Sequence, residues 1–340
     1  MVSIDLGYGY TKAVSERGRV IFPSVVAPAS DAGLDFGRTY RHVLEFRLPS
    51  EMRRRRFFVG EAALKEGRAA QLTLSRDRFH QESSVCLVLA AAYLAGAEKR
   101  TDLAVGLPLA YYRSRRDEAA RLLRSLNAYV SVDGGPEKYI TFDAVAVYPQ
   151  AVGALYALES LPEKGLLGVI DVGFHTTDYI LVECSPEGVA PLQSYTSSFE
   201  MGVATALKVF AGKFSEAAGV PLALTDAQEI WVSKRREITF RGRPFGVGTM
   251  LDTARREVGQ AIAQAVAAAW SEKIDVLDHV LLAGGGAEEF FPEIARLFPG
   301  AKLVPEPQWA NALGFYRLAG GRFSQVREKA GEAVGKETFR

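Results

Sequence analysis

The chain carries one short motif twice, and this duplication limits what it can fold into more than any other feature. Residues 4–12 read IDLGYGYTK and residues 170–178 read IDVGFHTTD, with Ile, Asp, Gly and Thr in register. Each copy follows an apolar run, so we expect Asp5 and Asp171 where a strand meets a tight turn. A glycine two positions later lets backbone N–H groups approach a ligand. The repeat therefore predicts two related halves with a cleft between them, in which the two turns grip one polyphosphate and its Mg²⁺.

Length and charge limit the possible functions. At 340 residues the chain is long enough for two cores. It contains 41 Lys and Arg against 40 Asp and Glu, so its bulk charge favours no direct contact with nucleic acid or an anionic membrane. Cys86 and Cys184 are too few for a disulfide framework and predict reduced thiols. The N-terminus begins with a strand rather than a basic segment and an apolar run, which predicts a cytoplasmic protein.

The order of the expected elements predicts two lobes. The first 25 residues are expected to form an antiparallel meander rather than a βαβ unit, because the connections are too short for helices. The predicted organisation is lobe I at 1–164 with an insertion at about 26–80, lobe II at 165–307 with an insertion at about 205–248, a helix at 308–325 that returns to lobe I, and a charged tail at 326–340.

The acidic residues at the two strand ends are the candidates for a metal site. Mg²⁺ prefers oxygen ligands and keeps much of its water, so Asp5 and Asp171 can hold it through water while it bridges phosphate oxygens. A single Asp at a turn often only caps that turn, but a matched pair favours a metal. Lys12 lies on the second strand of its hairpin, where its ammonium group can neutralise phosphate charge. Its counterpart is Asp178, so the two halves are related but not equivalent.

Other residues add to the predicted site. Gly284, Gly285 and Gly286 lie between an apolar strand and a helix, where N–H groups point outward, although such a triplet alone is more often a loop. Gln150 opens a helix that is expected to run from Ala151 to Leu161, and its amide can orient an attacking water or can simply be a polar residue at a helix start. His175 lies inside the second turn and either touches phosphate or is a plain turn residue. The sequence contains neither a P-loop nor a dinucleotide fingerprint.

Taken in order, these segments resemble the ATPase superfamily of actin, sugar kinases and heat-shock chaperones. The resemblance implies an α/β actin-like fold of two lobes, each with a mixed five-stranded sheet and helices, and two small inserted subdomains. The short insertions and the form of the second motif are most similar to prokaryotic actin-like proteins of the ParM plasmid-segregation type and their archaeal relatives. The motifs are the first phosphate motif at 5–12, the first connecting helix at 148–154, the second phosphate motif at 171–178, the adenosine motif at 281–287 and the second connecting helix at 309–314.

The resemblance also implies roles for individual residues. Asp171 would polarise the hydrolytic water and ligate Mg²⁺, and Gln150 would orient the water. ParM-type proteins tend to have Glu at the Gln150 position whereas actin has Gln, a difference that bears on the hydrolysis rate and not on ATP binding. Gly202 and Glu229 would lie beside the ribose and the adenine. The expected nucleotide-binding residues are Gly7, Tyr8, Gly9, Tyr10, Thr11, Lys12, Gly173, Phe174, His175, Thr176, Thr177, Gly202, Glu229, Gly284, Gly285 and Gly286.

Three functions of different classes are consistent with the predicted nucleotide site. The first is an ATPase that binds ATP or GTP with Mg²⁺ and polymerises into dynamic filaments, which segregate plasmid DNA through a DNA-binding adaptor. The second is an ATP-dependent kinase for a sugar or a small acid, which needs a catalytic base beside the γ-phosphate, and the sequence offers no separate acidic motif for it. The third is a nucleotide-switched scaffold of the pilus-assembly type with little turnover.

Overall fold

The computed structural model describes the backbone of residues 1–29, 42–66, 71–72 and 81–337, and the side chains of these residues other than 66, 71–72 and 324–337. The chain divides into two compact units. Unit 1 consists of Met1–Glu159 and Trp309–Arg340, and unit 2 consists of Ser160–Gln308. Several parts of the predicted segments lie outside the described residues, namely 30–41, 67–70 and 73–80 of the insertion at 26–80 and 338–340 of the charged tail.

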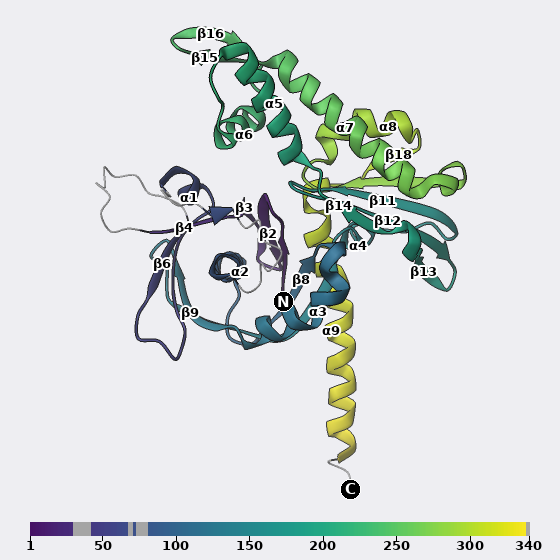
Figure 1. Ribbon diagram of the computed structural model, residues 1–340. Helices are drawn as coiled ribbons and strands as arrows, with labels where there is room; N and C mark the ends of the chain where they lie inside the picture. The colour runs from purple at the N-terminus through teal and green to yellow at the C-terminus, as the bar shows by residue number, and fades with distance from the viewer. Residues whose placement is uncertain (30–41, 67–70, 73–80, 338–340) are drawn as a thin grey trace. The chain divides into compact units, whose positions relative to one another are not determined.

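Unit 1 is built on one continuous twisted sheet (Figure 1). Its strands are β1 (Val2–Leu6), β2 (Tyr10–Ser15), β3 (Gly18–Pro23), β4 (Val25–Pro28), β5 (Val43–Arg47), β6 (Arg55–Val59), β7 (Gln71–Leu72), β8 (Thr101–Leu107), β9 (Asn127–Val132) and β10 (Lys138–Pro149). The strand order is β3-β2-β1-β8-β10-β9-β5-β6-β4-β7. β1, β2 and β3 form an antiparallel meander, whereas β8 runs parallel to both β1 and β10. The first five strands of this path are therefore the mixed five-stranded sheet that the resemblance implied.

Beyond β10 the same sheet continues through β9 and then through strands from the predicted insertion. β9, β5, β6 and β4 pair antiparallel with their neighbours, and they curve around one helix, α2 (Glu82–Leu94) (Figure 1). Residues from Ser83 to Ala92 on this helix are buried with the exception of Val85. Because α2 is apolar on nearly all sides, it needs partners all round, and the curved sheet supplies them.

The remaining helices of unit 1 include the C-terminal helix, which packs against the N-terminal strands. They are α1 (Glu61–Glu66), α3 (Leu109–Ser125), α4 (Val152–Tyr156) and α9 (Ala310–Glu337), the last preceded by a 3₁₀ turn, η4 (Pro307–Trp309). α9 packs against α4 and against β1 and β8. Phe315 of α9 is fully buried, and its ring stacks on Tyr148 of β10 with 5.9 Å between centroids. The C-terminal helix is therefore part of the same core as the N-terminal strands.

Unit 2 has a smaller mixed sheet. Its strands are β11 (Gly165–Val172), β12 (Thr177–Ser185), β13 (Gly188–Pro191), β14 (Ser197–Phe199), β17 (His279–Ala283) and β18 (Ala301–Leu303), and β15 (Glu237–Phe240) pairs with β16 (Arg243–Gly246) in a separate hairpin. The main path runs β13-β12-β11-β17-β18, and β14 pairs with β12. β11 and β12 are antiparallel, while β11, β17 and β18 are parallel. This path again holds the five strands that the resemblance implied.

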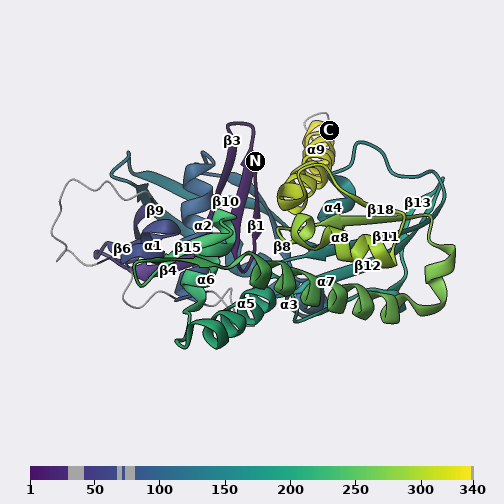
Figure 2. The same ribbon diagram turned by 90° about the horizontal axis from the view of Figure 1, so that it is seen from above.

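Helices cover this second sheet. They are η2 (Gln193–Tyr195), α5 (Val203–Ala218), α6 (Leu224–Ser233), α7 (Gly248–Trp270), η3 (Ser271–Val276) and α8 (Ala287–Leu297). α7 packs against both α5 and α8 (Figure 2). Large buried side chains fill the space between them, among them Phe210, Trp270 and Phe290. The β15–β16 hairpin is attached through Phe240 and Phe245, whose rings meet the edge of Phe214 on α5.

Helix ends differ from the sequence prediction at two places. α4 ends at Tyr156 although a helix was expected as far as 161, and the backbone enters it through Ala151 with a left-handed φ of 65°. α9 continues to Glu337 although a helix was expected only over 308–325. The segment after 325 is rich in Glu, Lys and Ala and contains no Pro, so helix propensity lets it extend the preceding helix.

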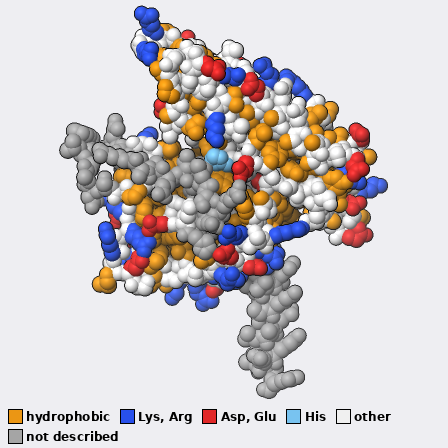
Figure 3. Space-filling model, in the orientation of Figure 1, with side chains coloured by type: hydrophobic (Ala, Val, Ile, Leu, Met, Phe, Trp, Pro, Cys, Tyr) orange, Lys and Arg blue, Asp and Glu red, His pale blue; other side chains and the backbone are white. Residues whose placement is uncertain are grey.

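The surface mixes charges of both signs. On the face drawn in Figure 3, Lys and Arg side chains are interspersed with Asp and Glu side chains. No described helix combines the length and the apolar character that crossing a membrane requires.

Candidate functional site

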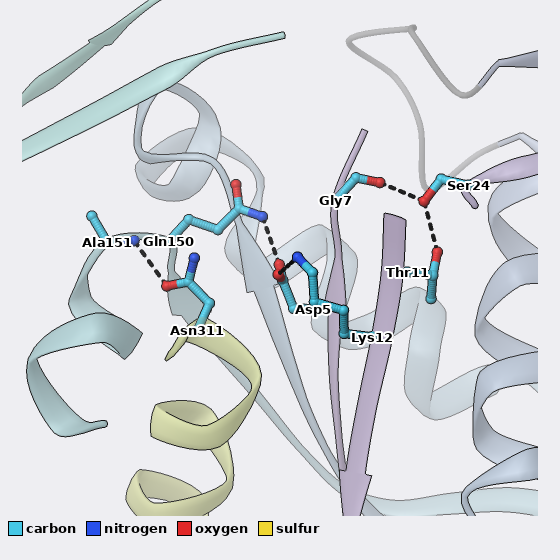
Figure 4. A network of polar contacts seen from close by, with 8 residues as sticks. All are labelled: Asp5, Gly7, Thr11, Lys12, Ser24, Gln150, Ala151 and Asn311. Carbon is cyan, nitrogen blue, oxygen red and sulfur yellow. Dashed lines mark hydrogen bonds and ion pairs between the residues drawn. The ribbon is translucent and has the colours of Figure 1, made fainter. Parts of the chain in front are cut away.

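Asp5 is the centre of a buried polar cluster in unit 1 (Figure 4). The antiparallel register of β1 and β2 places Asp5 opposite Lys12, on one face of the hairpin. The Lys12 Nζ atom donates to Asp5 Oδ2 at 2.8 Å, and Gln150 Nε2 donates to Asp5 Oδ1 at 2.9 Å. Asp5, Lys12 and Gln150 are only 3%, 7% and 8% exposed, so both carboxylate oxygens are satisfied inside the protein. Gln150 reaches this place because its own N–H donates to Leu107 O, at the end of the neighbouring strand β8.

The turn of the first hairpin is held by hydroxyl groups. Ser24 Oγ donates to Gly7 O at 2.7 Å and lies 2.8 Å from Thr11 Oγ1, so it accepts from Thr11 (Figure 4). A Cβ atom on Gly7 would lie 2.7 Å from Tyr10 O, closer than the two atoms can approach. Thr11 was predicted to bind nucleotide, but its side chain is fully buried and engaged with Ser24. In this structure Thr11 therefore positions the turn that Gly7, Tyr8, Gly9 and Tyr10 form.

Close packing between α4 and α9 fixes the segment that follows Gln150. Ala151 N donates to Asn311 Oδ1 at 3.1 Å, which stabilises the left-handed residue at the helix start (Figure 4). A Cβ on Gly153 would lie 2.8 Å from the Asn311 backbone, and a Cβ on Gly314 would overlap Gly153 O. Ser3 Oγ on β1 donates to Ala312 O at 2.7 Å. These contacts tie the first strand, the short helix and the C-terminal helix into one support for Gln150.

Asp171 occupies the corresponding position in unit 2. β11 and β17 are parallel, and their register pairs Asp171 with Ala283 at the carboxyl ends of both strands. Gly284 follows with a left-handed φ of 91°, and a Cβ there would overlap Asp171 Oδ1. The Asp171 carboxylate therefore packs directly on the glycine triplet, and this contact requires Gly284. On the other side, Asp178 is the register partner of Asp171 on β12, and the two are 3% and 5% exposed.

The second turn is fixed against the start of α5. Gly173 N donates to Thr176 O at 2.8 Å and closes the turn. Ala204 N, in the first turn of α5, donates to Phe174 O at 2.7 Å. A Cβ on Gly202 would lie 2.5 Å from Gly173 O, so only glycine permits this approach. Gly202 was predicted beside the ribose, and the structure places it in contact with the second turn.

The surroundings of His175 favour its neutral form. Burial and the nearby positive charge of Lys208 lower the pKa of His175 below its ordinary value, while the negative charge of Glu200 acts in the opposite direction. The ring meets the edge of Phe174 with 5.1 Å between centroids. A neutral imidazole can exchange a hydrogen bond with a phosphate, but it brings no positive charge to it.

The other predicted residues of unit 2 have different exposures. Gly285 is exposed, and a Cβ there would meet nothing closer than the Gln308 side chain at 3.9 Å. Gly286 is buried, and its N–H donates to Val172 O at 2.9 Å. Thr177 is fully buried and donates to Met201 O at 2.8 Å. Glu229 is an exposed residue of α6.

Ser24 and Asn311 were missed by the sequence analysis. Ser24 directly follows the Pro that ends the meander, and Asn311 lies within the second connecting-helix motif at 309–314. A hydroxyl after a strand and an amide in a helix are common in any sequence, so neither position carried a signal by itself. Their partners, Gly7 and Ala151, become neighbours only when the strands and helices pack.

The donor set agrees with a metal held mainly through water. In the described part of the chain, no three Asp, Glu, His or Cys side chains gather to hold a metal ion by themselves. Mg²⁺ usually takes one or two carboxylates together with waters and substrate phosphates. Asp5 of unit 1 and Asp171 of unit 2 are buried carboxylates near strand ends, each beside a turn whose glycine leaves no room for a side chain. In each unit taken by itself, so few carboxylates suit an ion that keeps most of its own waters better than one caged by protein ligands alone.

Each of the two units contains a run of five strands that mixes parallel and antiparallel pairing, and each has a hairpin that carries a buried carboxylate. These features define the actin class of fold. A family model of the N-terminal domain of actin-like proteins matches residues 3–153. A family model of the C-terminal domain of the archaeal MreB-like actin homologue matches residues 169–296. Between them the two models match most of the chain, and the chain belongs to the actin-like proteins, as the sequence motifs predicted. A search of the curated proteins found no match.

Solved structures with the same fold include ParM proteins and an archaeal actin. The chain is similar to a non-polymerisable quadruple mutant of pCBH ParM, with 21% identity over 94% of this chain and 98% of the other and a TM-score of 0.81. It is similar to the ParM of a 15-stranded filament from Clostridium botulinum, with 21% identity, coverage of 92% and 97% and a TM-score of 0.81. It is also similar to Ta0583, an archaeal actin homologue, in complex with ADP, with 24% identity, coverage of 94% and 99% and a TM-score of 0.76.

Proposed function

We propose that this chain binds and hydrolyses ATP or GTP with Mg²⁺ and polymerises into dynamic filaments in the cytoplasm. The observation that carries the proposal is the carboxylate-bearing hairpin that ends a central strand in both units, with Asp5 in one and Asp171 in the other. The ADP complex of the archaeal relative supports nucleotide binding. The filament structure of the ParM relative supports self-association.

The proposal assigns a role to each polar group of the site. Asp5 and Asp171 are metal ligands, mainly through water, and bound Mg²⁺ would neutralise phosphate charge. Gln150 donates its amide N–H to Asp5, which holds its carbonyl oxygen in one orientation to accept a hydrogen bond from the attacking water. Lys12 pairs with Asp5, and it offers its remaining ammonium protons to phosphate. The turns at 7–10 and 173–176 present backbone N–H groups to the phosphates.

A filament needs contacts that do not close into a ring. In a head-to-tail assembly each copy uses two different surfaces, so addition of copies continues without limit. Nucleotide can control such assembly if the polymerising form binds ATP more tightly than the free form does. Plasmid DNA would then be reached through a DNA-binding adaptor, because the near-neutral bulk charge offers no electrostatic drive toward DNA itself.

Sedimentation tests the polymerisation. Purified protein with Mg-ATP is expected to pellet above a critical concentration and to scatter light, because each added copy buries surface only in the assembled form. The same protein with ADP, or with ATP and excess EDTA, is expected to stay in the supernatant. Unchanged sedimentation across salts, temperatures and nucleotides would contradict the proposal. Phosphorylation of a sugar or small acid in the same samples would favour the kinase, and nucleotide binding without turnover would favour the scaffold.

Replacement of Gln150 by Ala separates catalysis from binding. Gln150→Ala is expected to lower the rate of ATP hydrolysis by about a hundredfold, because loss of an orienting group misplaces the water. Affinity for a fluorescent ATP analogue should stay within a few-fold of the wild type, since the phosphate-facing turns are unchanged. Phosphate release in single-turnover experiments measures the first quantity and fluorescence titration the second. Equal loss of both would mean that Gln150 supports the site rather than the chemistry.

A further inference from the structure

The guanidinium group of Arg317 on α9 lies at the C-terminal end of α4. Its Nη1 atom donates to Tyr156 O at 3.2 Å, to Ala157 O at 2.5 Å and to Leu158 O at 3.1 Å. These carbonyls belong to the last residue of α4 and to the two residues that follow it. The end of a helix leaves such groups without an intrahelical donor, and an arginine side chain can supply one. Arg317 is therefore the C-terminal cap of α4.

The sequence explains why a side chain is needed at this helix end. In a longer helix the three carbonyls would accept from the N–H groups four positions further on, at residues 160, 161 and 162. Residue 162 is a proline, which has no N–H group. Ser160 and Leu161 already belong to unit 2. α4 therefore ends where the chain leaves unit 1, and Arg317 holds that end from within unit 1.

One face of α9 holds α4 at three points. Asn311, Gly314 and Arg317 are spaced by three positions, so they lie on the same face of α9. Asn311 accepts from Ala151 N at the start of α4. Gly314 leaves room for the backbone of Gly153 in its middle, and Arg317 caps its end. Because α4 has only five residues, and isolated helices shorter than roughly 12 residues are marginal in water, its orientation depends on these contacts.

Gln150 directly precedes this short helix. Its Nε2 atom donates to Asp5 Oδ1 at 2.9 Å (Figure 4). Only Ala151 separates it from the first turn of α4, and Ala151 has a left-handed φ of 65°, which few L-residues adopt. A tilt of α4 would change the conformation of Ala151 and move Gln150 away from Asp5. The cap at one end of α4 therefore bears on the residue at the other end.

We infer that Arg317 is a positioning residue, which acts through α4 to hold Gln150 against Asp5. The inference rests on the proposed function, in which Gln150 orients the attacking water. Arg317 contacts carbonyls of α4 and not the site itself, so its loss should change the rate of hydrolysis and leave nucleotide binding nearly intact. A misplacement of about 1 Å can lower a rate by about a hundredfold, and release of one end of α4 is expected to cost about tenfold.

Hydrogen–deuterium exchange tests this role without any nucleotide. Arg317→Met removes the charge and the donors but keeps a long unbranched stem and a similar helix propensity. In the full-length protein, exchange in peptides that cover 150–158 is expected to become at least about fivefold faster, while exchange in β8 stays unchanged. Arg317→Lys keeps a charged donor and should recover part of the protection. Arg121→Met is the matched control, because Arg121 is an exposed residue of another helix of unit 1, α3.

A double-mutant comparison tests whether Arg317 acts through Gln150. Arg317→Met is expected to lower the rate of single-turnover ATP hydrolysis by about tenfold, with the affinity for a fluorescent ATP analogue within about twofold of the wild type. In a Gln150→Ala background the same change should have almost no further effect, because the group that it positions is already absent. A merely structural role would lower the rate by the same factor in both backgrounds.

Three results would overturn the inference: equal exchange at 150–158 in Arg317→Met and the wild type, faster exchange throughout unit 1, or equal losses of hydrolysis in the two backgrounds. Absence of hydrolysis in the wild type would contradict the proposed function instead. The exchange experiment would then still decide whether Arg317 holds the segment of Gln150, so the two proposals fail separately.

Discussion

Asp171→Asn is expected to lower the rate of Mg-ATP hydrolysis by about a thousandfold, because removal of one well-placed electrostatic group costs roughly 10²–10³ in rate and metal binding is weakened as well. Asn has the shape of Asp but no charge, so it neither attracts Mg²⁺ nor polarises a water. Its contact with Gly284 is preserved because the side chains are isosteric. Phosphate release at saturating Mg-ATP measures the effect. If hydrolysis destabilises the filaments as proposed, polymers formed with ATP should also persist longer.

The same substitution should not reduce stability. Asp171 and Asp178 are buried register partners on neighbouring strands, and like charges directly opposite each other are unfavourable. A Tm equal to or above that of the wild type is therefore expected alongside the loss of activity. The matched control is Asp278→Asn, because Asp278 accepts a hydrogen bond from Leu166 N at the other end of β11. Normal hydrolysis by Asp171→Asn, or a comparable loss in Asp278→Asn, would remove Asp171 from the chemistry.

Gly314→Ala is expected to lower the free energy of unfolding by about 3 kcal/mol, the upper part of the range for overpacked sites. The new methyl group would overlap Gly153 O, which belongs to the backbone of α4 and has no flexible end that can move aside. α9 would have to shift away from α4, and Asn311, which lies on α9 and accepts a hydrogen bond from Ala151 N, would move with it. Urea denaturation followed by far-UV circular dichroism measures the change as a lower midpoint with little change in slope.

A second glycine of α9 provides the control for this experiment. A Cβ on Gly321 would meet nothing within 4 Å, and the residue is exposed. Gly321→Ala is therefore expected to raise the free energy of unfolding by up to about 1 kcal/mol, through helix propensity alone. Opposite signs for the two substitutions would show that packing at Gly314, and not glycine content, determines the result. A neutral Gly314→Ala would mean that α9 does not rest on α4 as closely as the structure has it.

Much of the fold was predictable because its signals are local. The turns at Gly7 and Gly173 each follow an apolar run. A Cβ at either glycine would clash with the turn itself, so the glycine marks the turn in the sequence. The motifs also identified the family and the two sheets of mixed direction. The extent of α4 and α9 was less predictable, since helix ends depend on which side chains find a partner.

The arrangement of the candidate site could be predicted only in part. The sequence indicated Lys12 as a partner for phosphate, which stays a prediction, but it did not indicate that the ammonium group also pairs with Asp5 at 2.8 Å. Gln150 was placed at a helix start, but its hydrogen bond to Asp5 joins residues 145 positions apart. Thr11 carried a prediction of nucleotide contact, and burial turned its hydroxyl toward Ser24.

By itself, the sequence determined that the chain has two hairpins with an acidic residue at the strand end. It also determined the family of the chain and the glycines that the two turns require. These properties follow from the covalent order of neighbouring residues, because a turn or a strand involves only a few positions. Tertiary structure alone decided that Asp5 is shared by Lys12 and Gln150 and that Asn311 supports Ala151. Those contacts join residues far apart in the chain, and they form only when the sheets and helices pack and exclude water. Each buried polar group must then find its hydrogen-bond partner among the groups that packing brings next to it.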